Sequence, residues 1–154
     1  MSGCSPSSPV ARQSPGLGWV DRQILREPEN RDFQARYDTV RVDSAFLPLI
    51  GQSSSGVEVI VFLGTWCSDS KREVPHFLKI ADAGAIPEAG IRLYCLDRSK
   101  KSTDGMTEKF SIERVPTFVF LRGGHEIGRI TESPRATLEG DILAILVQSR
   151  QDGR

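Results

Sequence analysis

One cysteine stands between an apolar run and a predicted helix, with a serine three residues further on. The stretch VEVIVFLGTWCSDSK places Cys67 after the apolar run and Ser70 where a second thiol would complete a redox pair. Because a thiolate is the nucleophile in disulfide exchange, we expect Cys67 to attack a disulfide and form a mixed disulfide. Ser70 has no sulfur with which to release that bond, so release needs an external thiol or Cys95.

The start of the predicted helix should favour the thiolate of Cys67. The apolar spacing predicts a helix from Ser68 to about Ala83, and a cysteine at its N-terminus faces unpaired backbone N–H groups and the positive end of the helix dipole. Lys71 would add positive charge, and Ser70 could donate a hydroxyl hydrogen bond to the sulfur. Asp69 opposes a second negative charge, so Asp69 and Lys71 are the expected tuning residues.

The other patterns predict alternating strands and helices. Strands are expected at Val57–Leu63, Ile91–Asp97, Thr117–Leu121 and Glu126–Thr131. Helices are expected around Phe33 and Tyr37, near residues 43–51, at residues 68–83 with a bend at Pro75, and at residues 103–110. A last helix is expected after an N-cap pair at Ser133–Pro134. The two glycines in RGGH predict a hairpin turn. From Val57 the order β-α-β-α-β-β-α favours an α/β fold with a mixed sheet flanked by helices.

Composition divides the chain into three parts. Residues 1–18 are rich in Ser, Pro and Gly and predict a flexible tether. Residues 19–44 are expected to pack on the domain as an N-terminal extension. Residues 45–150 are expected to form the domain itself.

Charge and residue spacing exclude several classes of function. Lys+Arg and Asp+Glu are both 20 in a chain of 154 residues, so no electrostatic attraction to nucleic acid is expected. No apolar run approaches the roughly 20 residues that span a bilayer. His76 is expected in solvent and His125 in a turn, and no spacing matches a metal site. We expect no metal and no cofactor.

Several motifs together resemble the thioredoxin family. Trp66-Cys67-Ser68-Asp69-Ser70 resembles the W-C-x-x-C motif, Pro75 the proline of its helix, and Val115-Pro116-Thr117 its cis-proline loop. Gly123-Gly124 resembles the family's hairpin. The resemblance covers about Ala45 to Gln148 and implies a thioredoxin-like fold, with Trp66, Val115, Pro116 and Thr117 binding substrate beside Cys67.

The sequence departs from the family at two positions. Ser70 replaces the resolving cysteine, which makes the chain a monothiol variant. Val61 stands where thioredoxins carry a buried Asp that moves protons during resolution. Cys95 lies in an apolar strand, and a cysteine there is most often a small core residue.

Three functions remain open. The first is an enzyme, a monothiol thiol–disulfide oxidoreductase that acts in redox homeostasis through Cys67 and Ser70 on proteins or small thiols. The second is a binding module, in which the backbone before Pro116 pairs with an extended peptide. The third is a scaffold. We expect a monomer with no nucleic-acid partner.

The N-terminus leaves two locations open. Ser2-Gly3-Cys4 resembles the end of a bacterial lipobox, in which the cysteine carries a lipid. A signal peptide upstream of Ser2 would then place the protein in the periplasm or cell envelope, with a membrane contact only through Cys4. A native start at Met1 would place it in the cytoplasm and make Cys4 an ordinary tail residue.

Overall fold

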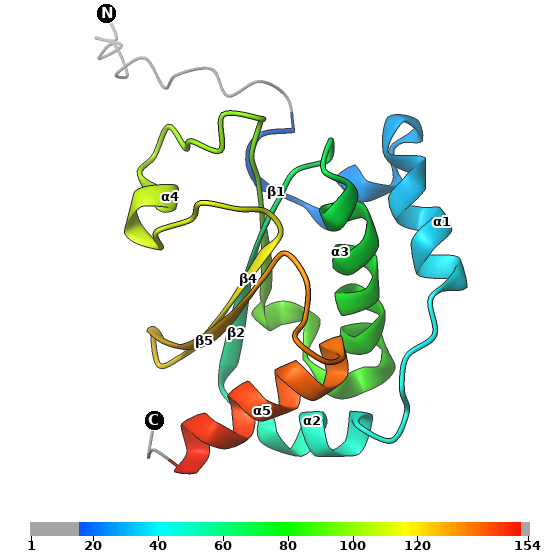
Figure 1. Cartoon of the computed structure of the whole chain (residues 1–154), viewed down its shortest axis with the longest axis vertical. Helices are drawn as coiled ribbons and strands as arrows, with labels where there is room; N and C mark the ends of the chain where they lie inside the picture. Colours follow the sequence, from blue (N-terminus) through cyan, green and yellow to red (C-terminus); the bar gives the residue numbers. More distant parts are fainter. Residues whose placement is uncertain (1–15, 152–154) are drawn as a thin grey trace, which may run out of the picture.

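A central mixed sheet organises the computed structural model, which describes residues 16–151 (Figure 1). The strands and helices are, in chain order, β1 (Gly18–Val20), α1 (Arg31–Thr39), α2 (Leu47–Ser53), β2 (Val57–Leu63), α3 (Ser68–Ile80), β3 (Ile91–Cys95), α4 (Met106–Lys109), β4 (Thr117–Arg122), β5 (His125–Thr131) and α5 (Leu138–Gln151). Short 3-10 turns occur at Arg22–Arg26, Pro28–Asn30 and Glu88–Gly90, and a π turn at Ala81–Ala85.

The strand order is β1-β3-β2-β4-β5. The central strand β2 pairs parallel with β3 and antiparallel with β4, and β5 pairs antiparallel with β4. This arrangement confirms the predicted α/β fold with a mixed sheet flanked by helices. Gly123 and Gly124 form the tight turn between β4 and β5 with φ values of +60° and +81°, a conformation that favours glycine.

The N-terminal segment contributes a strand that its composition did not predict. Gly18–Val20 pairs antiparallel with β3, so part of the expected extension belongs to the sheet. The predicted lipid site at Cys4 and most of the predicted tether lie outside the described residues. Between residues 16 and 151, no helix is both long and apolar enough to cross a membrane.

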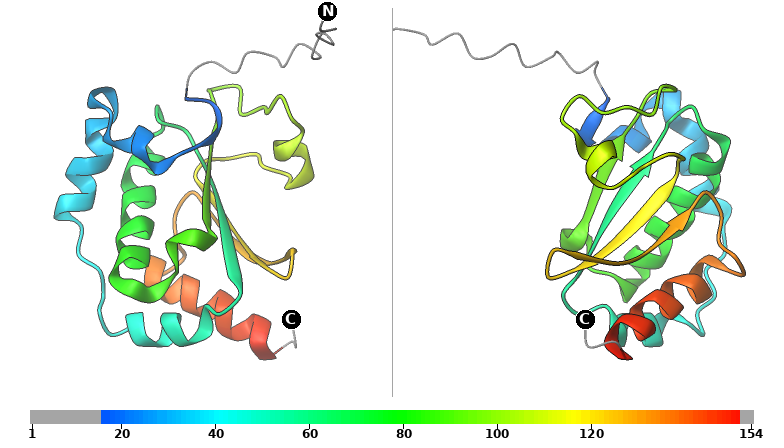
Figure 2. Two further views of the ribbon diagram at one scale, coloured as in Figure 1. Left: turned by 180° about the vertical axis from the view of Figure 1, so that it is seen from behind. Right: turned by 60° about the vertical axis from the view of Figure 1, so that its left-hand side comes forward.

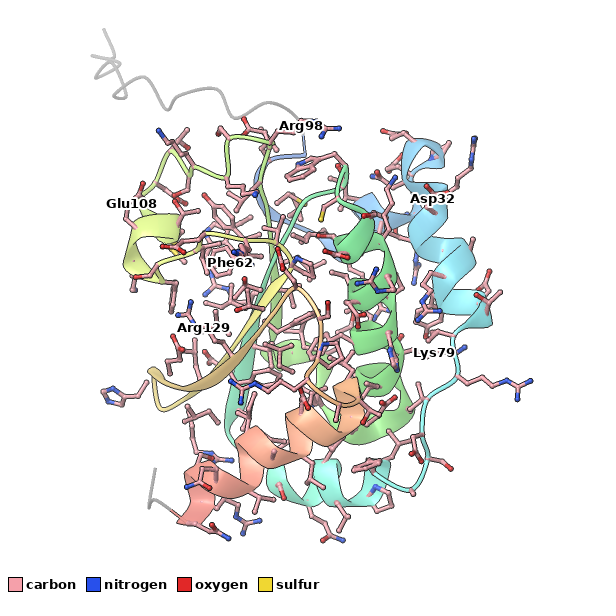
Figure 3. All side chains as sticks on the ribbon, in the orientation of Figure 1. Asp32, Phe62, Lys79, Arg98, Glu108 and Arg129 are labelled. Carbon is pink, nitrogen blue, oxygen red and sulfur yellow. The ribbon has the colours of Figure 1, made fainter. Side chains whose placement is uncertain are left out.

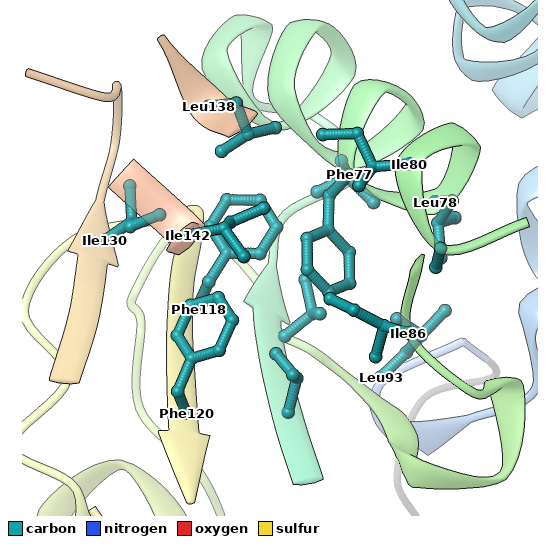
Figure 4. Packing of buried hydrophobic residues seen from close by; sticks show 14 of the residues in the cluster. Phe77, Leu78, Ile80, Ile86, Leu93, Phe118, Phe120, Ile130, Leu138 and Ile142 are labelled. Atoms are coloured by element: carbon teal, nitrogen blue, oxygen red, sulfur yellow. The ribbon is translucent and has the colours of Figure 1, made fainter. Parts of the chain in front are cut away.

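Helices cover the two faces of the sheet unequally. Helices α1, α2, α3 and α5 lie on one face and the short helix α4 on the other (Figures 1 and 2). A large apolar core fills the first face, where Phe77 of α3 packs against Phe118 and Phe120 of β4 and Ile142 of α5 lies beside them (Figure 4). A second, smaller core lies on the face that carries α4 and includes Phe62.

Helix α5 begins later than the sequence predicts. The expected N-cap at Ser133 is wrong, because the hydroxyl of Thr137 accepts a hydrogen bond from the Gly140 N–H at 3.0 Å and its carbonyl accepts the Asp141 N–H at 2.9 Å. The Asp141 carboxylate also accepts the Arg135 N–H at 2.6 Å. These bonds hold residues 133–137 in a turn before the helix.

Candidate active site

Cys67 lies at the N-terminus of α3, as the sequence predicts. Its backbone is extended, with φ −90° and ψ 124°, and its carbonyl accepts the Lys71 N–H at 3.0 Å, the bond that opens the helix. The Cys67 N–H donates to the Gly64 carbonyl at 3.1 Å. The side chain is half-buried and makes no capping hydrogen bond. The thiol therefore stands at the positive end of α3 with a route to solvent.

The loop before β4 faces this thiol from the other side. The Cys67 S–H donates to the Val115 carbonyl at 3.4 Å, and the Val115–Pro116 peptide bond is cis. The Thr117 hydroxyl donates to the Arg114 carbonyl at 2.6 Å, and the Pro116 carbonyl accepts the Glu132 N–H at 2.7 Å. These bonds fix the loop against Cys67, the position that the sequence predicted for it.

One backbone donor of this loop is free. Among residues 16–151 the Val115 N–H has no hydrogen-bond partner, while its carbonyl is the group that accepts the thiol proton. A free N–H and a carbonyl on one residue are the groups that an added β-strand uses. The loop therefore offers a backbone pairing site directly beside the sulfur.

Ser70 is fully buried and has a structural partner. Its Oγ accepts the Gly64 N–H at 3.1 Å, and its exposed fraction is 0%. The expected hydrogen bond from Ser70 to the sulfur is not found in the described part of the chain. Gly64 also lies close to Trp66, since a Cβ added to it would be 2.6 Å from the indole. Ser70 thus ties the start of α3 to the end of β2.

The two expected tuning residues are engaged in ion pairs. Lys71 pairs with Asp32 of α1 at 3.1 Å, and Asp69 pairs with Arg72 at 2.6 Å. Each charge next to Cys67 is thus partly neutralised by a neighbour that the spacing of residues 67–71 did not reveal. The roles of Asp69 and Lys71 in tuning the thiol stay predictions.

Trp66 is held in place by two contacts from the end of β3. Its Nε1–H donates to the Leu96 carbonyl at 2.9 Å, and the Arg98 guanidinium carbon lies 5.1 Å from the indole ring centre. Trp66 and Cys67 both pack against the smaller core. No pattern around Trp66 predicted either contact, because both partners are some 30 positions away in the chain.

Cys95 belongs to the opposite face of the sheet. It packs in the large core with an exposed fraction of 1%, whereas Cys67 borders the smaller core. Burial raises the pKa of the Cys95 thiol to about 12. Both cysteines are free thiols. Cys95 is therefore a core residue with neither the access nor the thiolate needed to release a bond at Cys67.

This buried thiol predicts a loss of stability at alkaline pH. The folded pKa lies above the value of about 8.5 in an unfolded chain, so the stabilisation is complete below that value and is lost as pH rises toward 12. From pH 9 to 10.5 we expect Cys95 alone to lower the free energy of unfolding by about 2 kcal/mol. Urea unfolding at both pH values measures the loss.

Cys95→Val is the matched comparison for this measurement. Tyr94, whose pKa burial and its hydrogen bond to Asp104 raise to about 12, contributes to the alkaline loss in both proteins. The variant should therefore lose about 2 kcal/mol less than the wild type between the two pH values. An equal loss in both would show that the Cys95 thiol titrates normally.

His76 and Glu139 form a buried pair that the sequence missed. The His76 Nε2 lies 2.6 Å from a Glu139 carboxylate oxygen, which also accepts the Asp43 N–H at 3.3 Å. The His76 side chain is 14% exposed and that of Glu139 3%, so the expectation that His76 faces solvent is wrong. A signal was present, because Glu139 shares a helical stripe with Ile142 and Leu146.

Comparison with known proteins places these features in a family. The family model described as thioredoxin matches residues 23–143. The chain belongs to the thioredoxin family. No group of metal-binding side chains occurs between residues 16 and 151. Val61 is fully buried in β2.

Relatives of this thioredoxin-family chain are distant. A thioredoxin-like protein of Acanthamoeba polyphaga mimivirus is 26% identical over 98 residues, which is 64% of this chain and 69% of the relative. A thioredoxin of Malassezia sympodialis is 33% identical over 86 residues, or 56% and 78% of the two chains. A Pseudomonas aeruginosa protein of unknown function has a similar fold, with a TM-score of 0.61, 16% identity and coverage of 79% and 85%.

Proposed function

We propose that this chain is a monothiol thiol–disulfide oxidoreductase. The observation that supports it is the place of Cys67, half-buried at the start of α3 with its sulfur 3.4 Å from the Val115 carbonyl. A helix N-terminus favours a thiolate, and the free Val115 N–H beside it suits an extended cysteine-containing segment. The proposal thus rests on a thiol and a backbone pairing site that lie side by side.

The proposed reaction has two exchanges. The Cys67 thiolate attacks one sulfur of a substrate disulfide, forms a mixed disulfide and expels the other sulfur as a thiolate. An external thiolate then attacks the substrate sulfur of that mixed disulfide. It forms a disulfide with the substrate, and Cys67 leaves as a thiolate. No electrons are gained or lost overall, and Trp66, Pro116 and Thr117 would contact the substrate.

The wild-type protein tests the proposal directly. A peptide disulfide is added without other thiols, and the adduct on Cys67 is followed by mass spectrometry. We expect one mixed disulfide on Cys67 that persists until an external thiol is added, and the Cys4→Ser variant excludes an adduct on the third thiol of the chain. A Cys67 that reacts no faster at neutral pH than a free cysteine would instead favour a peptide-binding or scaffold module, for which the free Val115 N–H is the supporting feature.

Ser70→Cys should convert the protein to a dithiol enzyme. The introduced thiol would lie one helical turn from Cys67, and we expect mild oxidation to join the two. We also expect substrate release at least about 100-fold faster than with about 1 mM external thiol, because the attack becomes intramolecular. Mass spectrometry under non-reducing conditions measures the bond, and stopped-flow release measures the rate.

Ser68→Cys is the matched control for this gain. It adds a thiol next to Cys67 in sequence, on the first residue of α3, where the side chain is exposed. A disulfide between neighbouring residues is strained, so this variant should keep the wild-type dependence on external thiol. Release without external thiol in the control, or no bond in Ser70→Cys, would contradict the proposed geometry.

The location is a separate proposal. The support is the Ser2-Gly3-Cys4 sequence, which would carry a lipid in the bacterial cell envelope. The full-length open reading frame tests it, since an apolar signal segment ending just before Ser2 is required. A native start at Met1 would place the protein in the cytoplasm instead.

A further inference from the structure

The Trp66 side of the site carries a cation, Arg98, that makes no ion pair with a carboxylate of residues 16–151. Its guanidinium carbon lies 5.1 Å from the centre of the Trp66 ring. Arg98 is exposed and lies at the end of the molecule where α3 begins (Figure 3). The guanidinium thus contacts the residue that directly precedes the reactive cysteine in the chain.

The turn that carries Arg98 has a fixed backbone and an excess of positive charge. The Asp97 carboxylate accepts the Ser99 N–H at 2.9 Å, and the Asp97 carbonyl accepts the Lys100 N–H at 3.0 Å. The hydrogen bonds from Ser99 also hold the pKa of Asp97 below its usual value, so that carboxyl stays ionised. With Arg98, Lys100 and Lys101, residues 97–101 carry a net charge of +2.

The other charges around Cys67 are largely paired. The ion pairs are Asp69–Arg72, Lys71–Asp32 and Arg114–Glu132. Asp104 and Glu108, further along the same segment, accept hydrogen bonds from the uncharged hydroxyls of Tyr94 and Ser102 and so keep their negative charges. Glu113 is an exposed acid on the Val115 side of the site. The positive charge beside Trp66 therefore comes from residues 97–101, while Asp104 and Glu108 place negative charge further along the same segment.

We propose that Arg98, with Lys100 and Lys101, selects cysteine-containing protein segments that carry acidic residues close to the reacting cysteine. The proposal rests on the oxidoreductase function proposed above and names its substrate class. An extended chain advances about 3.3–3.6 Å per residue, so two residues span about 7 Å. A carboxylate two or three positions from the cysteine would thus lie about 7–11 Å from it along the segment, and we propose that the basic turn receives this carboxylate.

Matched peptides test the selection. Each carries a cysteine as a mixed disulfide with thionitrobenzoate, flanked by two Glu, two Gln or two Lys residues, and the second-order rate of transfer to Cys67 is measured. We expect the Glu peptide to react about three- to tenfold faster than the Gln peptide at low salt, and the Lys peptide more slowly. The difference should shrink as salt screens the charges.

Three variants assign the effect to Arg98. Arg98→Glu should abolish or invert the preference, whereas Arg98→Lys should keep most of it because the charge remains. Arg41→Glu changes the net charge equally at an exposed position between α1 and α2 and should leave the preference unchanged. The readout in each variant is the ratio of the Glu-peptide rate to the Gln-peptide rate, because the shared thionitrobenzoate group and any change in the contact with Trp66 affect both peptides alike.

The outcomes separate the two proposals. Equal rates for the Glu and Gln peptides with the wild type, or a preference that survives Arg98→Glu, would overturn the selection and leave the oxidoreductase function standing. If the rate with glutathione disulfide depended on Arg98 while the rates with all the peptides did not, the substrate would be a small acidic thiol and the proposed selection of protein segments would be overturned. No reaction of Cys67 with any peptide would overturn both.

Discussion

We expect Cys67→Ala to abolish the formation of mixed disulfides. Cys95→Ala should leave the rate of that reaction within about twofold of the wild-type rate. The reason is access: Cys67 is half-buried beside Val115, and Cys95 lies in the large core with a pKa of about 12. The measurement is mass spectrometry of the adduct after reaction with a peptide disulfide at pH 7.

A Cys4→Ser background keeps this comparison clean. It removes the third thiol of the chain, which lies outside the described residues. Far-ultraviolet circular dichroism should show that both alanine variants are folded, since Cys95→Ala removes a buried sulfur. Loss of the adduct in Cys95→Ala but not in Cys67→Ala would show that the reactive sulfur is the buried one.

Glu139→Leu should lower the free energy of unfolding by about 3 kcal/mol. The carboxylate is buried and accepts hydrogen bonds from His76 and from the Asp43 N–H, so its loss leaves two partly buried polar groups without this partner. Urea unfolding measures the change. Glu139→Gln keeps an acceptor oxygen and should cost less than Glu139→Leu.

Two controls separate the buried pair from an ordinary charge. Glu126→Ala removes a partly exposed carboxylate that pairs with Arg129 at 2.6 Å, and should cost at most about 1 kcal/mol. His76→Leu combined with Glu139→Leu replaces both polar groups and should recover part of the loss. A cost for Glu139→Leu no larger than that for Glu126→Ala would contradict the role assigned to the pair.

Features set by short stretches of sequence could be predicted. The β-rich run 57–63, the helix from Ser68 and the glycine turn at Gly123 each depend on neighbouring residues. Their order was enough to indicate an α/β fold with a mixed sheet, and the resemblance to thioredoxins placed the Val115 loop opposite Cys67. The thiol and its backbone neighbour were therefore predictable although they lie 48 positions apart.

Features set by distant partners could not be predicted. Strand β1 has three residues, too few for a periodic signal, and exists because β3 presents an edge to it. The stacking of Arg98 on Trp66 and the pairing of Lys71 with Asp32 depend on how separate elements pack. Ser70 was expected to serve the sulfur, yet its place on the buried stripe of α3 turns its hydroxyl toward Gly64.

The sheet that separates Cys67 from Cys95 also has a kinetic consequence. Under the proposed function, no sulfur of the described chain can reach an adduct on Cys67, since Cys95 lies in the core of the opposite face. In the Cys4→Ser background the lifetime of each adduct is then set by the concentration of thiols around the protein. Purification without reductant should therefore retain the physiological substrates as covalent complexes, with no trapping mutation required.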